Sequence, residues 1–355
     1  MDNFKCGSMD FKISVIAPVY NAVDSLEIAI NSIINQTIGF KNIELILVDD
    51  KSNDGSQDII KKYADKYENV IGIFLKENSG LPGKPRSLGI KYASAPYLMF
   101  LDADDEYLPN AFELLYNTIV NEKSDFVMGS HFWNMNGERM KINILHDCND
   151  KSDVININPF LNQRNFILLS YNHVAPWGKI FNKELILKNN ISFPEDTLAE
   201  DTYFYFKTLI NSKKVTLLPN DSLYMYNVFE NKDSVIHTHN LSKFNYFLKG
   251  FANVMELIKD IPFSKERILI SNMGSLLLIF SNLSMKEKKE AVPKIYYFEK
   301  SLDEEVVLKR KELILLNKLI LKKHFYLAII ISDIYSILYN NEKIKNLYRK
   351  WGHKE

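Results

Sequence analysis

Hydrophobic residues come in short, uninterrupted runs through the first hundred positions of the chain. Four runs, at 13–19, 43–48, 70–75 and 97–101, are almost wholly apolar and alternate little with polar residues. Runs of this kind are typical of strands that are covered on both faces of a sheet. We therefore predict four buried strands in this part of the chain.

The segments between these runs repeat apolar residues at helical spacing. The stripes predict helices around residues 26–34, 59–67, 83–93 and 112–119, and Asp24 with Glu27 resembles an N-terminal cap on the first of them. Strands that alternate with helices favour an α/β fold, with a mainly parallel sheet and helices on both faces.

From about residue 241 the strand pattern fades and long helical stretches dominate. Pro262 and Pro293 are predicted to separate helices. We divide the chain into an N-terminal extension at 1–11, an α/β domain at 12–240, and a mainly helical C-terminal domain at 241–355.

One late segment, residues 325–339, is strongly apolar and has lysines on both sides. The default interpretation is a helix in the core of its own domain. A peripheral contact with an anionic membrane surface and a contact between copies of the chain in a homo-oligomer stay open. Asp333, inside the apolar segment, argues against deep insertion into lipid.

Composition narrows the classes of function. Lys and Arg total 44 and Asp and Glu total 44, so the formal net charge is zero, and a protein that coats nucleic acid with positive charge is not expected. The start lacks the apolar core of a signal peptide, and no apolar run approaches the roughly 20 residues of a membrane span. We expect a soluble, cytoplasmic protein.

Two cysteines, Cys6 and Cys148, exclude a disulfide-rich scaffold and a four-cysteine zinc site.

Acidic residues follow two of the predicted strands directly. Asp49 and Asp50 come after the second strand, and Asp102, Asp104 and Asp105 come after the fourth. Ligands of open α/β sheets bind outside the carboxyl ends of the strands. Carboxylates gathered at one edge repel one another unless a positive group lies among them, and these oxygen ligands suit Mg²⁺ or Mn²⁺ better than zinc.

An ordered set of segments resembles the family 2 glycosyltransferases, which have the GT-A fold. The segments are SVIAPVYN at 14–21, SIINQT at 32–37, ELILVDD at 44–50, SNDGS at 52–56, NSG at 78–80, Arg86 with Gly89-Ile90, FLDADD at 100–105, and Glu200-Asp201. The loop at 80–86 is also similar to that of bacterial transferases that glycosylate wall teichoic acid and related surface polymers. Ser87 and Ala95 depart from the family pattern, where Asn and Gly are common.

The resemblance implies a nucleotide-sugar donor, most often a UDP-sugar. Pro18 and Tyr20 would hold the base, and Asp50 would accept a hydrogen bond from the uracil or ribose. Asn78 and Arg86 would position the nucleotide. The plain alternatives are packing for Pro18 and Tyr20 and helix capping for Asp50.

Arg86 has two interpretations. Its planar fork suits a diphosphate, but it could instead form a structural ion pair with Asp102 or Asp50. The resemblance assigns Asp104 to direct metal binding, and Asp102 to the ribose or to the metal through water. His237 is a candidate for completing the metal shell, although a lone histidine is more often a surface or packing residue.

By the same resemblance, Asp201 is the general base that removes the acceptor proton, and Glu200 orients the acceptor or the base. The plain alternative for both is a favourable charge at a helix N-terminus. Trp177 could stack on a sugar ring or belong to the core.

The resemblance implies an inverting, metal-dependent glycosyltransferase. The expected acceptor is a polysaccharide, a teichoic-acid-like polyol-phosphate polymer or a lipid-linked glycan. A nucleotidyltransferase is disfavoured because no glycine-rich loop follows the first strand, and an oxidoreductase because no G-x-G-x-x-G turn is present. The remaining alternative is a non-catalytic module that binds the nucleotide sugar.

Overall fold

A computed structural model describes residues 10–135, 137–144, 152–170, 174–228, 240–263, 265–302 and 311–340. The chain divides into two compact units. One comprises Met1–Asp196 and Glu200–Asn231, and the other comprises Thr197–Ala199 and Lys232–Glu355.

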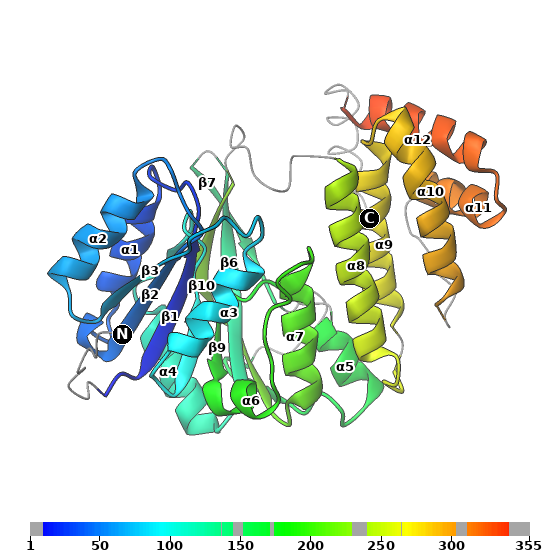
Figure 1. Cartoon of the computed structure of the whole chain (residues 1–355). Helices are drawn as coiled ribbons and strands as arrows, with labels where there is room; N and C mark the ends of the chain where they lie inside the picture. The colour runs from blue at the N-terminus through cyan, green and yellow to red at the C-terminus, as the bar shows by residue number, and fades with distance from the viewer. Residues whose placement is uncertain are drawn as a thin grey trace. The chain divides into compact units, whose positions relative to one another are not determined.

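The first unit is built on a single mixed sheet. The described strands have the order β3-β2-β1-β4-β9-β6-β10-β5, with β7 beside β6 and β8 beside β10 (Figure 1). Their bounds are β1 Ile13–Val19, β2 Ile43–Asp49, β3 Val70–Phe74, β4 Tyr97–Phe100, β5 Glu106–Tyr107, β6 Phe126–Met135, β7 Glu138–Ile142, β8 Ile155–Ile157, β9 Lys179–Asn182 and β10 Val215–Val228.

The first four strands confirm the predicted parallel half. β1 pairs in parallel with β2 and β4, and β2 pairs in parallel with β3. Beyond β4 the sheet becomes mixed, because β9 runs antiparallel to both β4 and β6. Two reversals restore the direction, so β6 and its parallel neighbour β10 end at the same edge as β1, β2 and β4.

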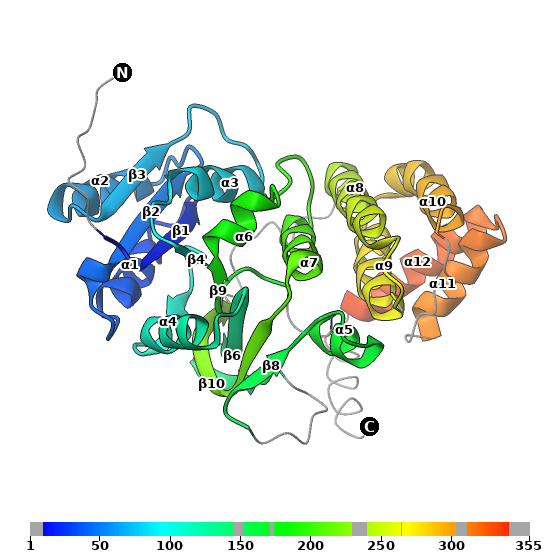
Figure 2. The same cartoon turned by 90° about the horizontal axis from the view of Figure 1, so that it is seen from below.

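Helices cover both faces of this sheet, as the pattern predicts (Figure 2). They are α1 Leu26–Ile34, α2 Ser56–Lys66, α3 Gly83–Tyr92, α4 Ala111–Glu122, α5 Gln163–Ser170, α6 Lys183–Lys188 and α7 Glu200–Asn211, with a 3₁₀ turn at Phe40–Asn42. Alternate residues of β1 face opposite layers. Val15 joins the core on the α1 side, and Ile16 lies so close to α3 that only a glycine, Gly89, fits opposite it.

The predicted cap on α1 is wrong. The helix begins after Ser25, and no side chain caps it. Glu27 instead forms a 2.7 Å ion pair with Lys62 on α2, so its charge links two helices rather than capping one.

The second unit is helical, as the sequence predicts. Its helices are α8 Leu241–Ile258, α9 Glu266–Ser281, α10 Met285–Lys300, α11 Lys311–Leu321 and α12 Phe325–Asn340. Pro262 separates α8 from α9, but Pro293 lies inside α10, so the second predicted break is wrong. Burial of Val292 and Ile295 in the core offsets the hydrogen bond that the proline removes.

The apolar segment of α12 has two sides. Ala328 and Ile329 belong to the core of the second unit, whereas Tyr326, Leu327 and Ile330 are exposed. Among the described residues, no helix combines the length and the apolar character needed to cross a membrane.

Candidate active site

The carboxyl ends of the parallel strands bring the candidate residues to one edge of the sheet. Val19, Asp49 and Phe100 end β1, β2 and β4, which lie side by side. Pro18, Tyr20, Asp50 and Asp102 therefore come from adjacent strand ends, where α/β sheets bind ligands.

Asp50 fastens a neighbouring loop to this edge. Its buried carboxylate accepts hydrogen bonds from the backbone N–H and the hydroxyl of Ser79, both at 2.8 Å. Asn78 donates to the Asp50 carbonyl at 3.0 Å, and its own side-chain oxygen accepts from the Gly80 N–H at 2.6 Å. The loop that carries Asn78 is thus held against the strand end that carries Asp50.

Asp50 does not cap the next helix, which was the alternative considered for it, since α2 begins after Gly55 without a side-chain cap. Asp54 accepts from the Ser56 N–H at 3.0 Å at the start of α2, and from the Val23 N–H at 2.9 Å. Asp49 accepts from the Ser52 N–H at 3.2 Å and from Gln57 at 2.7 Å. The carboxylate of Asp50 contacts Ser79 instead.

Tyr20 presents its ring to solvent at the end of β1. The residue is 54% exposed, which differs from the packing role that was its plain alternative, and Pro18 two positions earlier is half-buried. An exposed aromatic face beside Asp50 is available to stack on a flat ligand.

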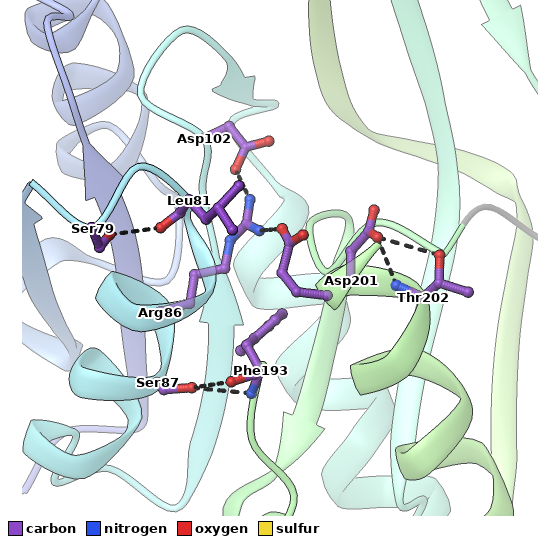
Figure 3. Close-up of polar contacts among 9 residues, drawn as sticks. Ser79, Leu81, Arg86, Ser87, Asp102, Phe193, Asp201 and Thr202 are labelled. Carbon is purple, nitrogen blue, oxygen red and sulfur yellow. Dashed lines mark hydrogen bonds and ion pairs between the residues drawn. The ribbon is translucent and has the colours of Figure 1, made fainter. Parts of the chain in front are cut away.

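Arg86 connects two acidic segments that lie far apart in sequence. Its Nη2 donates to Asp102 Oδ1 and its Nη1 donates to Glu200 Oε1, each at 2.8 Å (Figure 3). The arginine and Glu200 side chains are each 7% exposed. Burial would lower the pKa of Arg86, but the carboxylates of Asp102 and Glu200 raise it, so the guanidinium stays charged.

Burial acts on Glu200 in the opposite direction, because it lowers the pKa of a base such as arginine and raises the pKa of an acid. Burial, together with the nearby charge of Asp201, raises the pKa of Glu200 to about 7, against the lowering effect of Arg86. Glu200 begins α7 and points at Arg86, so it serves as the structural partner of the arginine in this arrangement.

Asp201, the next residue, points elsewhere and is only half-buried. Its Oδ1 accepts from the backbone N–H of Thr202 at 2.6 Å and from the Thr202 hydroxyl at 3.3 Å (Figure 3). The buried ammonium of Lys179 on β9 is close enough to Asp201 for their charges to interact. Asp201 is thus a positioned carboxylate with access to solvent.

The first half of α3 is fixed against the segment that leads to α7. The Ser87 hydroxyl donates to the Phe193 carbonyl and accepts from the Phe193 N–H, both at 3.0 Å (Figure 3). A Cβ on Gly83 would lie 2.1 Å from the Pro194 carbonyl oxygen, so only glycine fits there. Ser87 therefore helps to hold Arg86 and Glu200 in register. Ala95, the other departure from the family pattern, is buried, and its N–H donates to Ser14 Oγ at 3.0 Å.

The loop after β4 is anchored through Asp105. This residue is 1% exposed and accepts from the Tyr224 hydroxyl at 2.9 Å and from the Asn227 N–H at 2.8 Å. Burial, with Asp102 and Asp104 nearby, raises the pKa of Asp105. Asn227 also donates to the Asp104 carbonyl at 2.9 Å, which fixes the backbone of the D-x-D segment.

The carboxylate oxygens at this loop fit a hard divalent cation that also binds a substrate. Asp102 and Asp104 are half-buried carboxylates on one short loop, whereas Asp105 is engaged by its own partners. Within the described ranges no cluster of three or more His, Cys, Asp or Glu residues could hold a metal alone. Mg²⁺ commonly takes one or two carboxylates and completes its shell with water and substrate phosphates. His237, like Cys6 and Cys148, lies outside the described residues.

The sequence is similar to proteins of known family. Residues 14–188 match the model of the family Glycosyl transferase family 2. The chain is 33% identical over 255 residues to the poly(ribitol-phosphate) beta-N-acetylglucosaminyltransferase TarP of Staphylococcus aureus, which covers 70% of this chain and 72% of that protein. The chain belongs to glycosyl transferase family 2.

Two further comparisons extend the likeness. The minor teichoic acid biosynthesis protein GgaB of Bacillus subtilis is 32% identical over 332 residues, which is 90% of this chain and 35% of that protein. The poly(ribitol-phosphate) beta-glucosyltransferase of Bacillus spizizenii is 34% identical over 207 residues, 58% of this chain and 31% of that protein. This chain thus spans about a third of the length of these two relatives.

The fold is shared with a solved structure. Residues 1–349 of TarS from S. aureus, in complex with UDP-GlcNAc, superpose with a TM-score of 0.70 at 22% identity, covering 92% of each chain. The mixed sheet with flanking helices and C-terminal helices is the fold that the family resemblance implies, so the fold prediction is confirmed.

Several residues that build this site in the family 2 glycosyltransferase have no role assigned from the sequence. Asp105 is the buried anchor of the D-x-D loop. Its partner Tyr224 comes from β10, and nothing in the sequence spacing connects the two. Lys179 was assigned no role of its own. Trp177 is 6% exposed and stacks on Tyr224 with ring centroids 4.4 Å apart, which places it in the wall behind the loop.

Proposed function

We propose that this chain transfers a sugar from a UDP-sugar to a hydroxyl of a surface polymer, with inversion at the anomeric carbon. The observation that carries the proposal is the Arg86 bridge. It joins the D-x-D loop to the Glu200-Asp201 pair at the carboxyl edge of the sheet, beside Asp50 and the exposed ring of Tyr20. The proposed transferase domain is residues 12–240.

The donor would lie along this edge. Tyr20 would stack on the base, with Pro18 beneath it, and Asp50 and Asn78 shape the loop that borders the base and ribose. Asp102 would contact the ribose. Arg86 keeps its charge within reach of the diphosphate while it holds Asp102 in place.

Asp104 would hold a Mn²⁺ or Mg²⁺ ion together with the donor diphosphate, and the ion would supply charge that stabilises the leaving UDP. Asp102 is the second carboxylate available to it. Solved structures support the donor class, because TarS residues 1–349 were solved in complex with UDP-GlcNAc, and a distant structural neighbour, a mannosyltransferase from Pyrobaculum calidifontis, in complex with GDP-Man and Mn²⁺.

Asp201 would act as the general base. Among the described residues both of its hydrogen bonds fall on Oδ1, so Oδ2 is the oxygen that we assign to the acceptor proton. As the acceptor oxygen attacks the anomeric carbon, its proton passes to Asp201, and the bond between that carbon and the UDP oxygen breaks. A single displacement with one base inverts the configuration. Glu200, occupied by Arg86, orients this arrangement rather than taking the proton.

The acceptor class follows from the relatives. Two act on poly(ribitol-phosphate) by name, and a third serves minor teichoic acid biosynthesis. We propose a teichoic-acid-like polyol-phosphate polymer or a related glycan as the acceptor, polymer-bound or lipid-linked, and no nucleic acid partner.

The test is a transfer assay with the purified chain. UDP release from UDP-GlcNAc and UDP-glucose is measured with poly(ribitol phosphate), with and without Mn²⁺, for the wild type and Asp201→Asn. Acceptor- and metal-dependent release that the variant loses supports the proposal. Donor binding with neither transfer nor hydrolysis for any combination would replace it with a non-catalytic nucleotide-sugar-binding module.

We also propose that the protein works in the cytoplasm at the inner face of the cell membrane. The exposed apolar residues of α12 lie near the exposed Lys318, Lys322 and Lys323, which favours anionic lipid. Sedimentation with phosphatidylglycerol vesicles, but not with phosphatidylcholine vesicles, is the expected result. Elution of the chain as a dimer or trimer in size-exclusion chromatography with light scattering would assign this surface to a homo-oligomer instead.

A further inference from the structure

Exposed aromatic and sulfur-containing side chains lie on the sheet beyond the D-x-D loop. Trp133 near the end of β6 is 39% exposed, and Met140 on β7 is 52% exposed. Large apolar side chains on the outside of a soluble domain mark binding sites when they form a contiguous set. These two residues are directly opposite each other in the antiparallel pairing of β6 with β7.

The strand register places a third ring in the same row. Trp133 is the partner of Tyr226 on β10, and their ring centroids are 6.2 Å apart. Residues paired in register lie on the same face of a sheet. Met140, Trp133 and Tyr226 therefore form one row across three adjacent strands, which we name the aromatic row.

The aromatic row continues the wall of the candidate active site. Tyr226 stacks on Trp177 at 5.6 Å, and Trp177 stacks on Tyr224, whose hydroxyl accepts from the Asp102 N–H at 3.2 Å and donates to Asp105. Burial, with Asp105 and Asp102 nearby, raises the pKa of Tyr226 to about 12, so its hydroxyl stays neutral at physiological pH. Exposure thus increases outward from the D-x-D loop towards Trp133.

The topology places this row at the ligand-binding edge. β6 and β10 run in the same direction as β4, because two antiparallel pairings separate β4 from β6. Trp133 and Tyr226 near their carboxyl ends lie at the edge where β4 delivers Asp102.

The charges of the described residues around the row favour a neutral ligand over a phosphate-rich one at this position. The cations of β7, Arg139 and Lys141, pair with Asn134 and Phe132, so they are on the opposite face from Trp133. A phosphate-rich chain would find no described cation in the row. Aromatic faces carry negative potential and attract polarised C–H groups, which a pyranose ring presents on its flat faces.

We propose that Met140, Trp133 and Tyr226 form a stacking subsite for a pyranose ring of the acceptor, one position beyond the reacting hydroxyl. This assignment rests on the proposed transferase function, since the row matters to turnover only if a sugar is transferred beside it. It names a sugar ring, rather than a polyol phosphate, as the acceptor unit that the enzyme recognises here.

Saturation-transfer NMR with the purified full chain tests the subsite without turnover. The probes are N,N′-diacetylchitobiose and cellobiose, with ribitol 5-phosphate for comparison. We expect saturation of the pyranose ring protons in the wild type and in Trp133→Phe, and about tenfold weaker binding in Trp133→Ala, as for the loss of one stacking ring. Tyr92→Ala, which removes a ring that is 56% exposed on α3, is the matched control and leaves binding unchanged.

The outcomes separate the subsite from the proposed function. Three results would overturn the subsite: no saturation transfer to either disaccharide, equal saturation transfer in Trp133→Ala and the wild type, or the same dependence on Trp133 for ribitol 5-phosphate. Failure of every UDP-sugar to bind or react, while disaccharide binding still depends on Trp133, overturns the proposed function and leaves the subsite standing. In an active enzyme, Trp133→Ala raises the acceptor KM, whereas Tyr92→Ala leaves the acceptor KM unchanged.

Discussion

Nη1 of Arg86 lies 2.8 Å from Oε1 of Glu200, and the two side chains are separated by 114 residues in sequence. The contact joins α3 to the start of α7, and the other arm of the same guanidinium holds Asp102. The positions of the D-x-D loop and of Asp201 therefore depend on one buried arginine.

Replacement of Arg86 tests this dependence. Arg86→Met leaves two carboxylates without their buried cation, and loss of one partner of a buried ion pair costs roughly 3–5 kcal/mol. We expect a lower melting temperature and little transfer. Arg86→Lys keeps the charge but cannot donate to both carboxylates from a planar fork, so it recovers stability in part. Glu200→Gln combined with Arg86→Met should be less destabilised than the sum of the two, and strict additivity in urea unfolding would contradict the bridge.

Asp201→Asn separates chemistry from donor binding. Loss of a general base lowers kcat by about 10²–10⁴-fold, and donor affinity should stay within about twofold because we assign Asp201 to the acceptor. Steady-state kinetics and calorimetric titration measure the two quantities. Glu195→Gln, at an exposed position six residues earlier, is the control. An equal loss of donor affinity would show that Asp201 belongs to the donor site.

Gly83 is predicted to be intolerant of any side chain. Gly83→Ala places a Cβ 2.1 Å from the Pro194 carbonyl oxygen, which must shift the segment that leads to Glu200. We expect a loss of about 1–3 kcal/mol in the free energy of unfolding, together with reduced kcat. Gly274→Ala is the matched control, because its Cβ would meet nothing within 4 Å and helical alanine is favoured over glycine. Calorimetric melting that ranks the two variants equally would contradict the packing argument.

The buried Glu299 makes the helical unit sensitive to pH. Burial raises the pKa of Glu299 to about 7, against the lowering effects of Asn317 and Lys300. The folded state then holds a proton that the unfolded state releases, so stability falls as pH rises from about 4.5 to about 7. Glu299→Gln keeps the buried group neutral and should be more stable than wild type at pH 8, by roughly 1–3 kcal/mol, and similar at pH 4.5.

Chemical unfolding at the two pH values, followed by circular dichroism, checks this prediction. Glu290→Gln on the same helix removes only a surface ion pair with Lys294 and should change stability little at either pH. A Glu299→Gln variant that is less stable than wild type at pH 8 would show that the ionised form has partners in the fold.

Local pattern was enough to predict the parallel half of the sheet. The strand at 13–19 agrees with β1 at both ends, and the helix over 83–93 ends one residue earlier, at Tyr92. The antiparallel half was less accessible. β9 and β10 are held by pairings with strands far away in sequence, and local periodicity carries no record of such partners.

The site residues divide in the same way, into those that local pattern predicts and those that depend on distant parts of the chain. Asp50, Asp102 and Asp104 could be predicted to lie at this edge of the sheet because they come just after buried strands. Asp105, Tyr224 and Lys179 were missed because their importance comes from contacts between distant segments, such as the 2.9 Å bond between Tyr224 and Asp105. The Arg86 to Asp102 pair was considered from sequence, but the second arm to Glu200 was not, since helix α7 reaches α3 only through the fold.

We propose that Asp104 lies in a metal-dependent UDP-sugar site. The most direct measurement is the shift in melting temperature of the purified chain with UDP-GlcNAc or UDP-glucose, with Mn²⁺ and with EDTA, for the wild type and Asp104→Asn. Binding to the folded state at 100 times Kd adds about 2.7 kcal/mol of stability, which such a scan resolves easily. We predict a shift for a UDP-sugar that requires Mn²⁺ and disappears in Asp104→Asn. An equal shift in EDTA or in the variant, or no shift with any nucleotide sugar, would contradict the account.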